Sequence, residues 1–197
     1  MARVLLMRRS GGDHMTRTLV VYYSRTGTTR TAARQIAHTL GADLEEIEPY
    51  TPRSGMLGYL RSAVEASLGR LTGIEPLVYE PEDYDLVAIG SPVWNAALSS
   101  PVRTYLAENH ARIKRVAFFC TFRHYGSEAV LHQMESLCGK KPTASLVLED
   151  REVARGGAHP SVTRFTKTIR EALAPYEPRL VKARSASESA ALRWSRA

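Results

Sequence analysis

The chain of 197 residues has only two cysteines, Cys120 and Cys138. They form no Cys-x-x-Cys pair and no cluster with the spacing of metal ligands, so we expect two reduced thiols and no metal site. A structural disulfide between them is left open as an alternative. Because reduced thiols are typical of the cytoplasm, we expect a cytoplasmic protein, with Cys120 in the core at the end of an apolar run.

The sequence also lacks a long apolar run. Near the N-terminus only four consecutive residues are apolar, whereas the core of a signal peptide has about 7–15. No window approaches the roughly 20 apolar residues that span a bilayer. We therefore expect no secretory leader and no membrane span, and we divide the chain into an N-terminal extension (1–14), one domain (15–178) and a disordered or frayed basic tail (179–197).

The central part of the sequence also lacks a strong positive charge, although the formal net charge of the chain is +7. Residues 1–14 carry a balance of +2 and residues 181–197 a balance of +3, which leaves the region between them near +2. The excess charge therefore lies in the two ends, where it can aid solubility or meet an acidic surface. Nucleic acid is not an expected partner, and binding through the tails stays a minor alternative.

Several phosphate-handling motifs are absent. There is no G-x-x-x-x-G-K-[ST] loop and no G-x-G-x-x-G fingerprint, which excludes two common nucleotide-binding loops. A cysteine phosphatase is excluded because Gly126 and Ala144 stand where an arginine should follow the two cysteines. A phosphoacceptor receiver domain is excluded because Ser91 ends the third strand where an aspartate is needed.

Apolar, strand-like runs alternate with amphipathic segments over most of the chain, a pattern typical of a parallel sheet covered on both faces. We predict an α/β fold, a doubly wound five-stranded parallel sheet in the order 2-1-3-4-5 within three α/β/α layers. The predicted strands are 18–23, 44–48, 85–90, 115–121 and 144–148. The predicted helices are 28–40, 55–71, one beginning near Ser99 to Pro101, 127–137, and one with its apolar side between 162 and 173.

A hydroxyl-rich turn joins the first predicted strand to the first predicted helix. Ser24, Thr26, Thr28 and Thr29 offer hydroxyl donors there, and Gly27 can take a positive φ. Such a turn aims backbone N–H groups at an anion, and the helix dipole favours negative charge at the same point. The sequence predicts a site for a phosphate monoester, and the alternative is a tight turn whose threonines only cap. The flanking Arg25 and Arg30 are expected at the solvent surface.

Two further loops should meet this turn, since the carboxyl ends of adjacent parallel strands lie at one edge of the sheet. They are Ser91–Asn95 and Thr121–Gly126, and both contain aromatic residues. Hydrogen-bond donors for a phosphate, next to aromatic side chains, are typical of a site for a planar ring joined to a phosphate, as in FMN. The candidate cofactor-binding residues are Ser24, Arg25, Thr26, Gly27, Thr28, Thr29, Ser91, Pro92, Val93, Trp94, Asn95, Thr121, Phe122, Arg123, His124, Tyr125 and Gly126.

The sequence from about Thr18 to Leu173 resembles the flavodoxin-like family of FMN proteins. Residues 24–29 are similar to the phosphate loop [ST]-x-T-G-x-T of that family, and residues 90–94 resemble the loop whose aromatic side chain covers the isoalloxazine ring. Residues 120–126 fall where the third flavin loop of the family lies. The chain departs from the family's electron carriers in not being acidic and in having no glycine beside Trp94, where Asn95 can tolerate positive φ.

The resemblance implies an FMN-binding redox protein that moves electrons between a donor, such as NAD(P)H or a reductase, and an acceptor, such as a quinone or a protein partner. An electron carrier and an NAD(P)H-dependent FMN or quinone reductase both stay open, and no catalytic residue is assigned. The alternative is a binding module that keeps the fold without flavin. We also predict that Arg123 and His124 raise the flavin potential, that the helix 55–71 faces the core or covers a ligand or partner subunit, and that a homodimer is possible.

Overall fold

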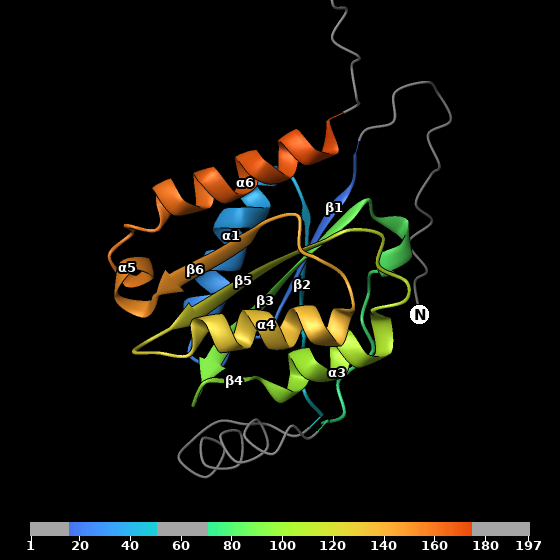
Figure 1. The fold of residues 1–197 in the computed structure, drawn as a ribbon, viewed down its shortest axis with the longest axis horizontal. Coiled ribbons are helices and arrows are strands. Elements are labelled where there is room, and N and C mark those ends of the chain that lie inside the picture. Colours follow the sequence, from blue (N-terminus) through green and yellow to red (C-terminus); the bar gives the residue numbers. More distant parts are fainter. Residues whose placement is uncertain (1–15, 51–70, 175–197) are drawn as a thin grey trace, which may run out of the picture.

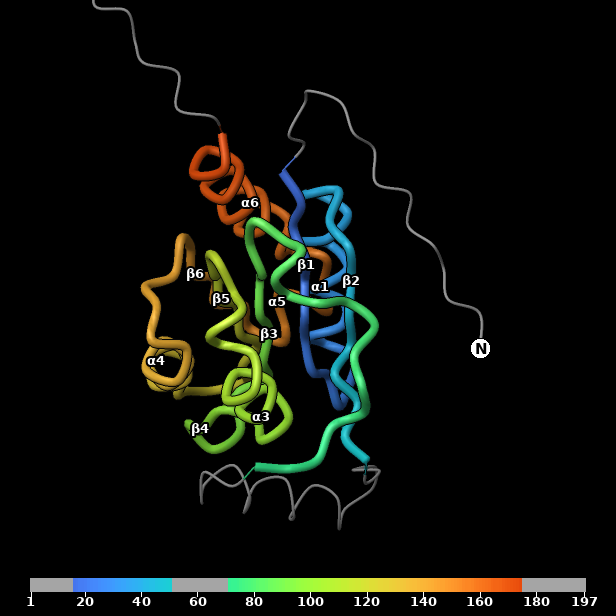
Figure 2. Tube along the Cα trace, turned by 90° about the vertical axis from the view of Figure 1, so that its right-hand side faces the viewer, coloured from blue at the N-terminus to red at the C-terminus, as the bar shows by residue number. Residues whose placement is uncertain are grey.

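In the computed structural model, residues 16–50 and 71–174 are described (Figure 1). Within these residues the sheet has six strands, and a short one, β4 (Ala97–Leu98), pairs only with the end of β3. The other five are parallel: β1 (Thr18–Tyr22), β2 (Asp43–Glu46), β3 (Leu86–Trp94), β5 (Val116–Phe122) and β6 (Ser145–Glu149). Their order is β2-β1-β3-β5-β6, which can be followed from right to left in Figure 2. Counting only these strands, this is the predicted order 2-1-3-4-5. The predicted fold class and topology are confirmed.

Helices cover both faces of the sheet (Figure 1). On one face lie α3 (Ser100–Asn109) and α4 (Ser127–Cys138), and on the other lie α1 (Thr28–Leu40), α5 (Asp150–Ala154) and α6 (His159–Leu173). Successive strand residues point to opposite faces. Leu19 and Val21 of β1 therefore pack on the α3/α4 side and Val20 packs on the α1/α6 side. Burial on both faces explains why the central strands β1, β3 and β5 are mainly apolar.

The crossing segment, residues 71–80, runs beside β2. A short 3-10 turn, η1 (Pro81–Asp83), then leads into β3. The backbone N–H groups of Val78 and Tyr79 both donate to one carboxylate oxygen of buried Glu45, at 3.1 and 3.0 Å. Burial raises the pKa of the Glu45 carboxyl, and these two N–H donors oppose that rise. The crossing is thus held by a carboxylate that is costly to ionise.

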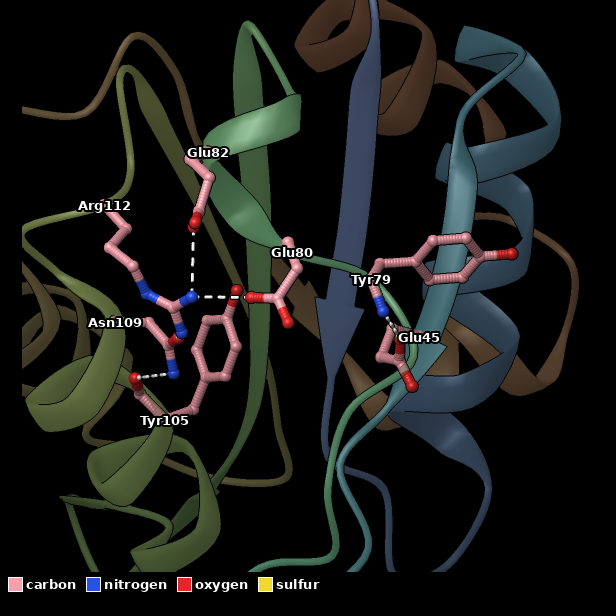
Figure 3. Close-up of polar contacts among 7 residues, drawn as sticks. All are labelled: Glu45, Tyr79, Glu80, Glu82, Tyr105, Asn109 and Arg112. Atoms are coloured by element: carbon pink, nitrogen blue, oxygen red, sulfur yellow. Dashed lines mark hydrogen bonds and ion pairs between the residues drawn. The ribbon is translucent and has the colours of Figure 1, made fainter. Parts of the chain in front are cut away.

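An ion-pair cluster fixes the next part of the same crossing segment. Arg112 follows α3 and contacts the carboxylates of Glu80 and Glu82 at 2.5 and 3.0 Å, and its guanidinium also donates to Asn109 (Figure 3). Asn109 in turn donates to the carbonyl oxygen of Tyr105 at 2.9 Å. These contacts join the entrance of β3 to the C-terminal end of α3, at the end of β3 opposite the predicted site.

The two cysteines are both buried and free, so the alternative of a disulfide between them is wrong. Burial raises the pKa of the Cys120 thiol to about 12. None of the helices within 16–50 and 71–174 is long and apolar enough to cross a membrane. The predicted N-terminal extension and basic tail lie outside the described residues, as does the predicted helix 55–71 apart from Leu71.

Candidate functional site

Three connections leave the carboxyl edge of the sheet side by side, because β1, β3 and β5 are adjacent at its centre. The first leads from β1 to α1, the second from β3 into a hairpin, and the third from β5 to α4. The three predicted segments are thus brought to one edge, where the winding of the chain reverses. In open α/β sheets this is the place where ligands bind.

The first loop presents the N-terminus of α1. Gly27 stands at the N-cap position with φ 94°, no side chain caps the helix, and its first turn carries no acidic residue. The hydroxyl of Ser24 accepts a hydrogen bond from the Gly27 N–H at 3.2 Å, which fixes the turn just before the helix. The N–H groups at the start of an uncapped helix have no partner within it, so they can bind an anion.

The threonines of this loop divide into two kinds. Thr29 is 1% exposed, and its Oγ1 lies 2.8 Å from Oγ1 of Thr121 on β5, which is 2% exposed. These two hydroxyls bind each other and lock the start of α1 to the central sheet. Thr26 is exposed and Thr28 is half-buried, and neither side chain has a hydrogen bond among the described residues. The hydroxyls available to an anion are therefore those of Thr26 and Thr28.

Arg25 and Arg30 were expected at the solvent surface; both are half-buried there, and each also has a partner within the fold. Arg30 makes a two-point contact with Glu46 on β2, at 2.7 and 2.9 Å. The same carboxylate accepts from the hydroxyl of Tyr22 at 2.8 Å, and burial together with Glu46 raises the pKa of Tyr22 to about 12. Arg25 instead reaches the second segment, with its Cζ 5.0 Å from the ring centroid of Trp94. Both arginines thus have partners within the fold.

The second segment differs from its predicted form. Residues 91–94 were expected to follow the third strand as a loop, but β3 continues to Trp94 and pairs in antiparallel fashion with β4 (Ala97–Leu98). The hairpin is held by the hydroxyls of Ser91 and Ser99, which lie 2.9 Å apart and are buried. Ser91 is therefore a structural support rather than an exposed donor. Pro92 and Val93 are half-buried, and Trp94 is 9% exposed.

The tip of this hairpin is a two-residue turn with unusual backbone angles. Asn95 has φ 49° and Ala96 has φ 57°. The expected tolerance of Asn95 for positive φ is realised, whereas alanine in this conformation is strained. Gln133 on α4 supports the turn: its amide nitrogen donates to the carbonyl of Ala96 at 3.2 Å and its amide oxygen accepts from the N–H of Leu98 at 3.1 Å. Nothing in the sequence pattern singled out Gln133.

The third segment touches the hairpin directly. The hydroxyl of Tyr125 donates to Asn95 Oδ1 at 3.2 Å. Gly126, with φ 92°, approaches so closely that a Cβ there would lie 2.5 Å from the Cα of Ala96. The second and third segments therefore form one rim. Thr121 and Phe122 belong to β5 rather than to the predicted loop, because the pairing with β6 extends to Glu149.

The charged residues of the third segment point outward. Arg123, His124 and Tyr125 are all exposed. The Nε of Arg123 lies 3.8 Å from Oδ2 of Asp150, the first residue of α5, and its side chain is 71% exposed. Since α5 follows directly after β6, this contact holds Arg123 on the side of the third segment that faces the edge strand.

The arrangement as a whole fits a phosphate attached to a flat ring. An uncapped helix N-terminus with a positive-φ glycine and two available hydroxyls suits the phosphate, and a buried indole on the neighbouring strand suits the ring. Within the described ranges, no group of three or more histidine, cysteine or acidic side chains is arranged to hold a metal ion. The donors present are those of an anion site.

Comparisons with known proteins agree with this geometry. A flavoprotein from Lactobacillus acidophilus NCFM, solved in complex with FMN, is 26% identical, with a TM-score of 0.60 over 71% of this chain and 97% of that one. A protein from Bacteroides uniformis ATCC 8492 shares the fold at 24% identity, with a TM-score of 0.66 over 77% and 98% of the two chains. Two-electron reduced flavodoxin from Megasphaera elsdenii is 15% identical, with a TM-score of 0.50 over 78% and 98%.

Among curated proteins, none matches the sequence. The sequence model of the flavodoxin family matches residues 17–156, which include the three segments of the site and every strand described above. On this match, together with the strand order and the loop at the start of α1, the chain belongs to the flavodoxin family.

Proposed function

We propose that the chain binds FMN at the carboxyl edge of its sheet and passes electrons from a reduced donor, such as NAD(P)H or a reductase, to an acceptor, such as a quinone or a protein partner. The observation that carries this proposal is the uncapped N-terminus of α1, opened by Gly27 and locked to β5 through Thr29 and Thr121. The FMN complex of a relative that is 26% identical supports the choice of ligand.

Each segment has a distinct role in this proposal. The N–H groups at the start of α1 and the hydroxyls of Thr26 and Thr28 hold the phosphate. Trp94 and the hairpin behind it form the wall for the ring, and Tyr125 and Gly126 keep the third segment against that wall. FMN supplies the redox chemistry when bound, while the protein fixes its position and its surroundings. Ser91, Thr29 and Thr121 are buried supports that keep the three segments together.

Reconstitution with FMN tests the binding step. We expect the purified chain to take up one FMN, identified by chromatography after heat release, and to quench flavin fluorescence. Removing both hydroxyls, in Thr26→Val with Thr28→Val, should raise the Kd for FMN by at least about 100-fold, since each hydrogen bond to a charged group is worth about 1.5–3 kcal/mol.

Thr39→Val is the matched control, because Thr39 lies on the last turn of the same helix and its hydroxyl donates to the carbonyl of Gln35 within that helix. Its Kd should equal that of the wild type. A wild-type chain that takes up no FMN would leave the alternative of a flavodoxin-fold binding module without flavin.

Steady-state assays separate the two redox roles. NAD(P)H oxidation with added quinone, under saturating FMN, indicates a reductase. Absence of turnover with the same donor, together with reduction of the bound FMN by a chemical reductant, indicates an electron carrier that depends on a separate reductase.

A further inference from the structure

Two arginines stand near the rim, and they are placed differently. The sequence predicts that Arg123 and His124 raise the flavin potential, and both side chains are exposed. Arg123 is the permanently charged one of the two. Its guanidinium instead lies 3.8 Å from the Asp150 carboxylate, beside the edge strand, and its side chain is 71% exposed. A charge that is both paired and exposed to water has a weak influence at a distance.

Arg25 lies in a better place to act on a bound ring. It comes from the loop after β1, yet its guanidinium lies 5.0 Å from the centroid of the Trp94 ring at the end of β3. The contact therefore spans the middle of the site, from the phosphate loop to the aromatic wall. Trp94 is 9% exposed, so little of this residue is open to solvent.

The hairpin gives the Arg25 contact a fixed partner. Trp94 pairs with Ala97, and the turn between them is held by Gln133 and by the Tyr125–Asn95 hydrogen bond. A guanidinium stacked on a rigid indole keeps its position better than one on a free side chain, and its weak hydration favours such a partly buried site.

We propose that Arg25, and not Arg123, is the cation that sets the reduction potential of FMN bound at this edge. The inference rests on the proposed function, in which the flavin ring lies against Trp94. A ring in contact with the indole lies within about 10 Å of the stacked guanidinium whichever face it takes. Two-electron reduction adds negative charge to the flavin, so this cation stabilises the reduced form more than the oxidised form and raises the potential.

Two measurements distinguish this role from simple phosphate binding. A cation that touches only the phosphate strengthens binding of oxidised and reduced FMN equally and leaves the potential unchanged. A cation beside the ring changes the ratio of the two affinities. A change in the Kd for oxidised FMN alone therefore indicates a charge at the phosphate, whereas a change in the midpoint potential indicates a charge beside the ring.

The experiment compares Arg25→Gln, Arg25→Lys and Arg123→Gln as FMN complexes, by fluorescence titration and by redox titration against indicator dyes. In Arg25→Gln the reduced-to-oxidised affinity ratio should fall about tenfold, which lowers a two-electron potential by about 30 mV. Arg25→Lys keeps the charge and should retain most of the wild-type potential. Arg123→Gln should change the ratio by less than about twofold.

The outcomes are separable. An Arg25→Gln complex with the wild-type potential overturns the inference, as does a larger shift in Arg123→Gln. A higher Kd in Arg25→Gln with an unchanged potential places the charge at the phosphate instead and also overturns it. If Arg25→Gln holds FMN too weakly to titrate, the Arg25→Lys complex decides, since a potential well below the wild type despite the retained charge refutes the role. Failure of the wild-type chain to bind FMN refutes the proposed function itself.

Discussion

The buried contact between Thr29 and Thr121 gives a prediction that joins the fold to the site. Thr29→Val removes one hydroxyl at nearly constant volume and leaves the Thr121 hydroxyl buried without its partner. Both residues are at most 2% exposed, and the two oxygens are 2.8 Å apart. An orphaned buried polar group costs about 1–3 kcal/mol, so we expect the free energy of unfolding to fall by that amount. Thr121→Val should have a similar cost.

The double variant is the decisive part of this test. When both hydroxyls are absent, no polar group is stranded, and the total loss should be smaller than the sum of the two single losses by about 1 kcal/mol or more. Urea unfolding followed by far-UV circular dichroism measures the three values. Thr166→Val serves as the control, because this hydroxyl is equally buried but bonds only to carbonyls of its own helix.

The same variants should affect the ligand. Because the pair fixes the start of α1 against β5, either single variant should weaken FMN binding, whereas Thr166→Val should not. Purely additive losses for Thr29→Val and Thr121→Val, with no effect on FMN affinity, would refute the view that this hydrogen bond holds the phosphate loop in place.

Three further predictions concern glycine, a buried carboxylate and pH. Gly126→Ala should lower the free energy of unfolding by about 2 kcal/mol or more, because the new Cβ collides with Ala96 and the residue also has positive φ. Gly139→Ala at the other end of α4 is the control: it has positive φ but open space, so it should lose only about 1 kcal/mol in the same urea assay. Glu45→Gln should keep the stability of the wild type at pH 7, since one amide oxygen can accept from the N–H groups of both Val78 and Tyr79. Glu45→Ala removes the acceptor and should lose about 1–3 kcal/mol. Equal losses in the two variants would show that these hydrogen bonds do not stabilise the segment. Burial raises the pKa of Cys120 to about 12, above the value near 8.5 of an unfolded thiol. The free energy of unfolding should therefore fall as pH rises above about 8.5, because only the unfolded chain loses this proton. In unfolding curves between about pH 8.5 and 10, Cys120→Ala should show a smaller decrease than the wild type.

The sequence predicted the centre of the sheet well because the central strands are buried on both faces and form short apolar runs. Leu19, Val20 and Val21 form such a run, and all three are fully buried. The turn at Gly27 was also predictable, because the residue types expected for an anion site at a helix N-terminus are adjacent in the sequence. Local pattern therefore sufficed for the turn at Gly27, and together with the simplest doubly wound arrangement it sufficed for the strand order.

Other features depend on contacts between residues far apart in the chain. Pro92 reads as the end of a strand, yet β3 runs through it because the Ser91–Ser99 contact and the hairpin continue the pairing. Ala96 gives no sign of a positive φ in the sequence, and its contacts come from Gln133 on α4 and from Gly126 just before that helix. The position of Arg25 over Trp94 likewise follows only from the adjacency of β1 and β3.

Comparing FMN with riboflavin tests the central claim most directly, because the two differ only in the phosphate that the start of α1 is proposed to hold. Equilibrium titration of the flavin-free chain, followed by flavin fluorescence, should give one FMN per chain and a riboflavin Kd at least about 100-fold higher, as expected for the loss of several charge-assisted hydrogen bonds. Equal affinities for the two flavins, or no uptake of either, would contradict the account.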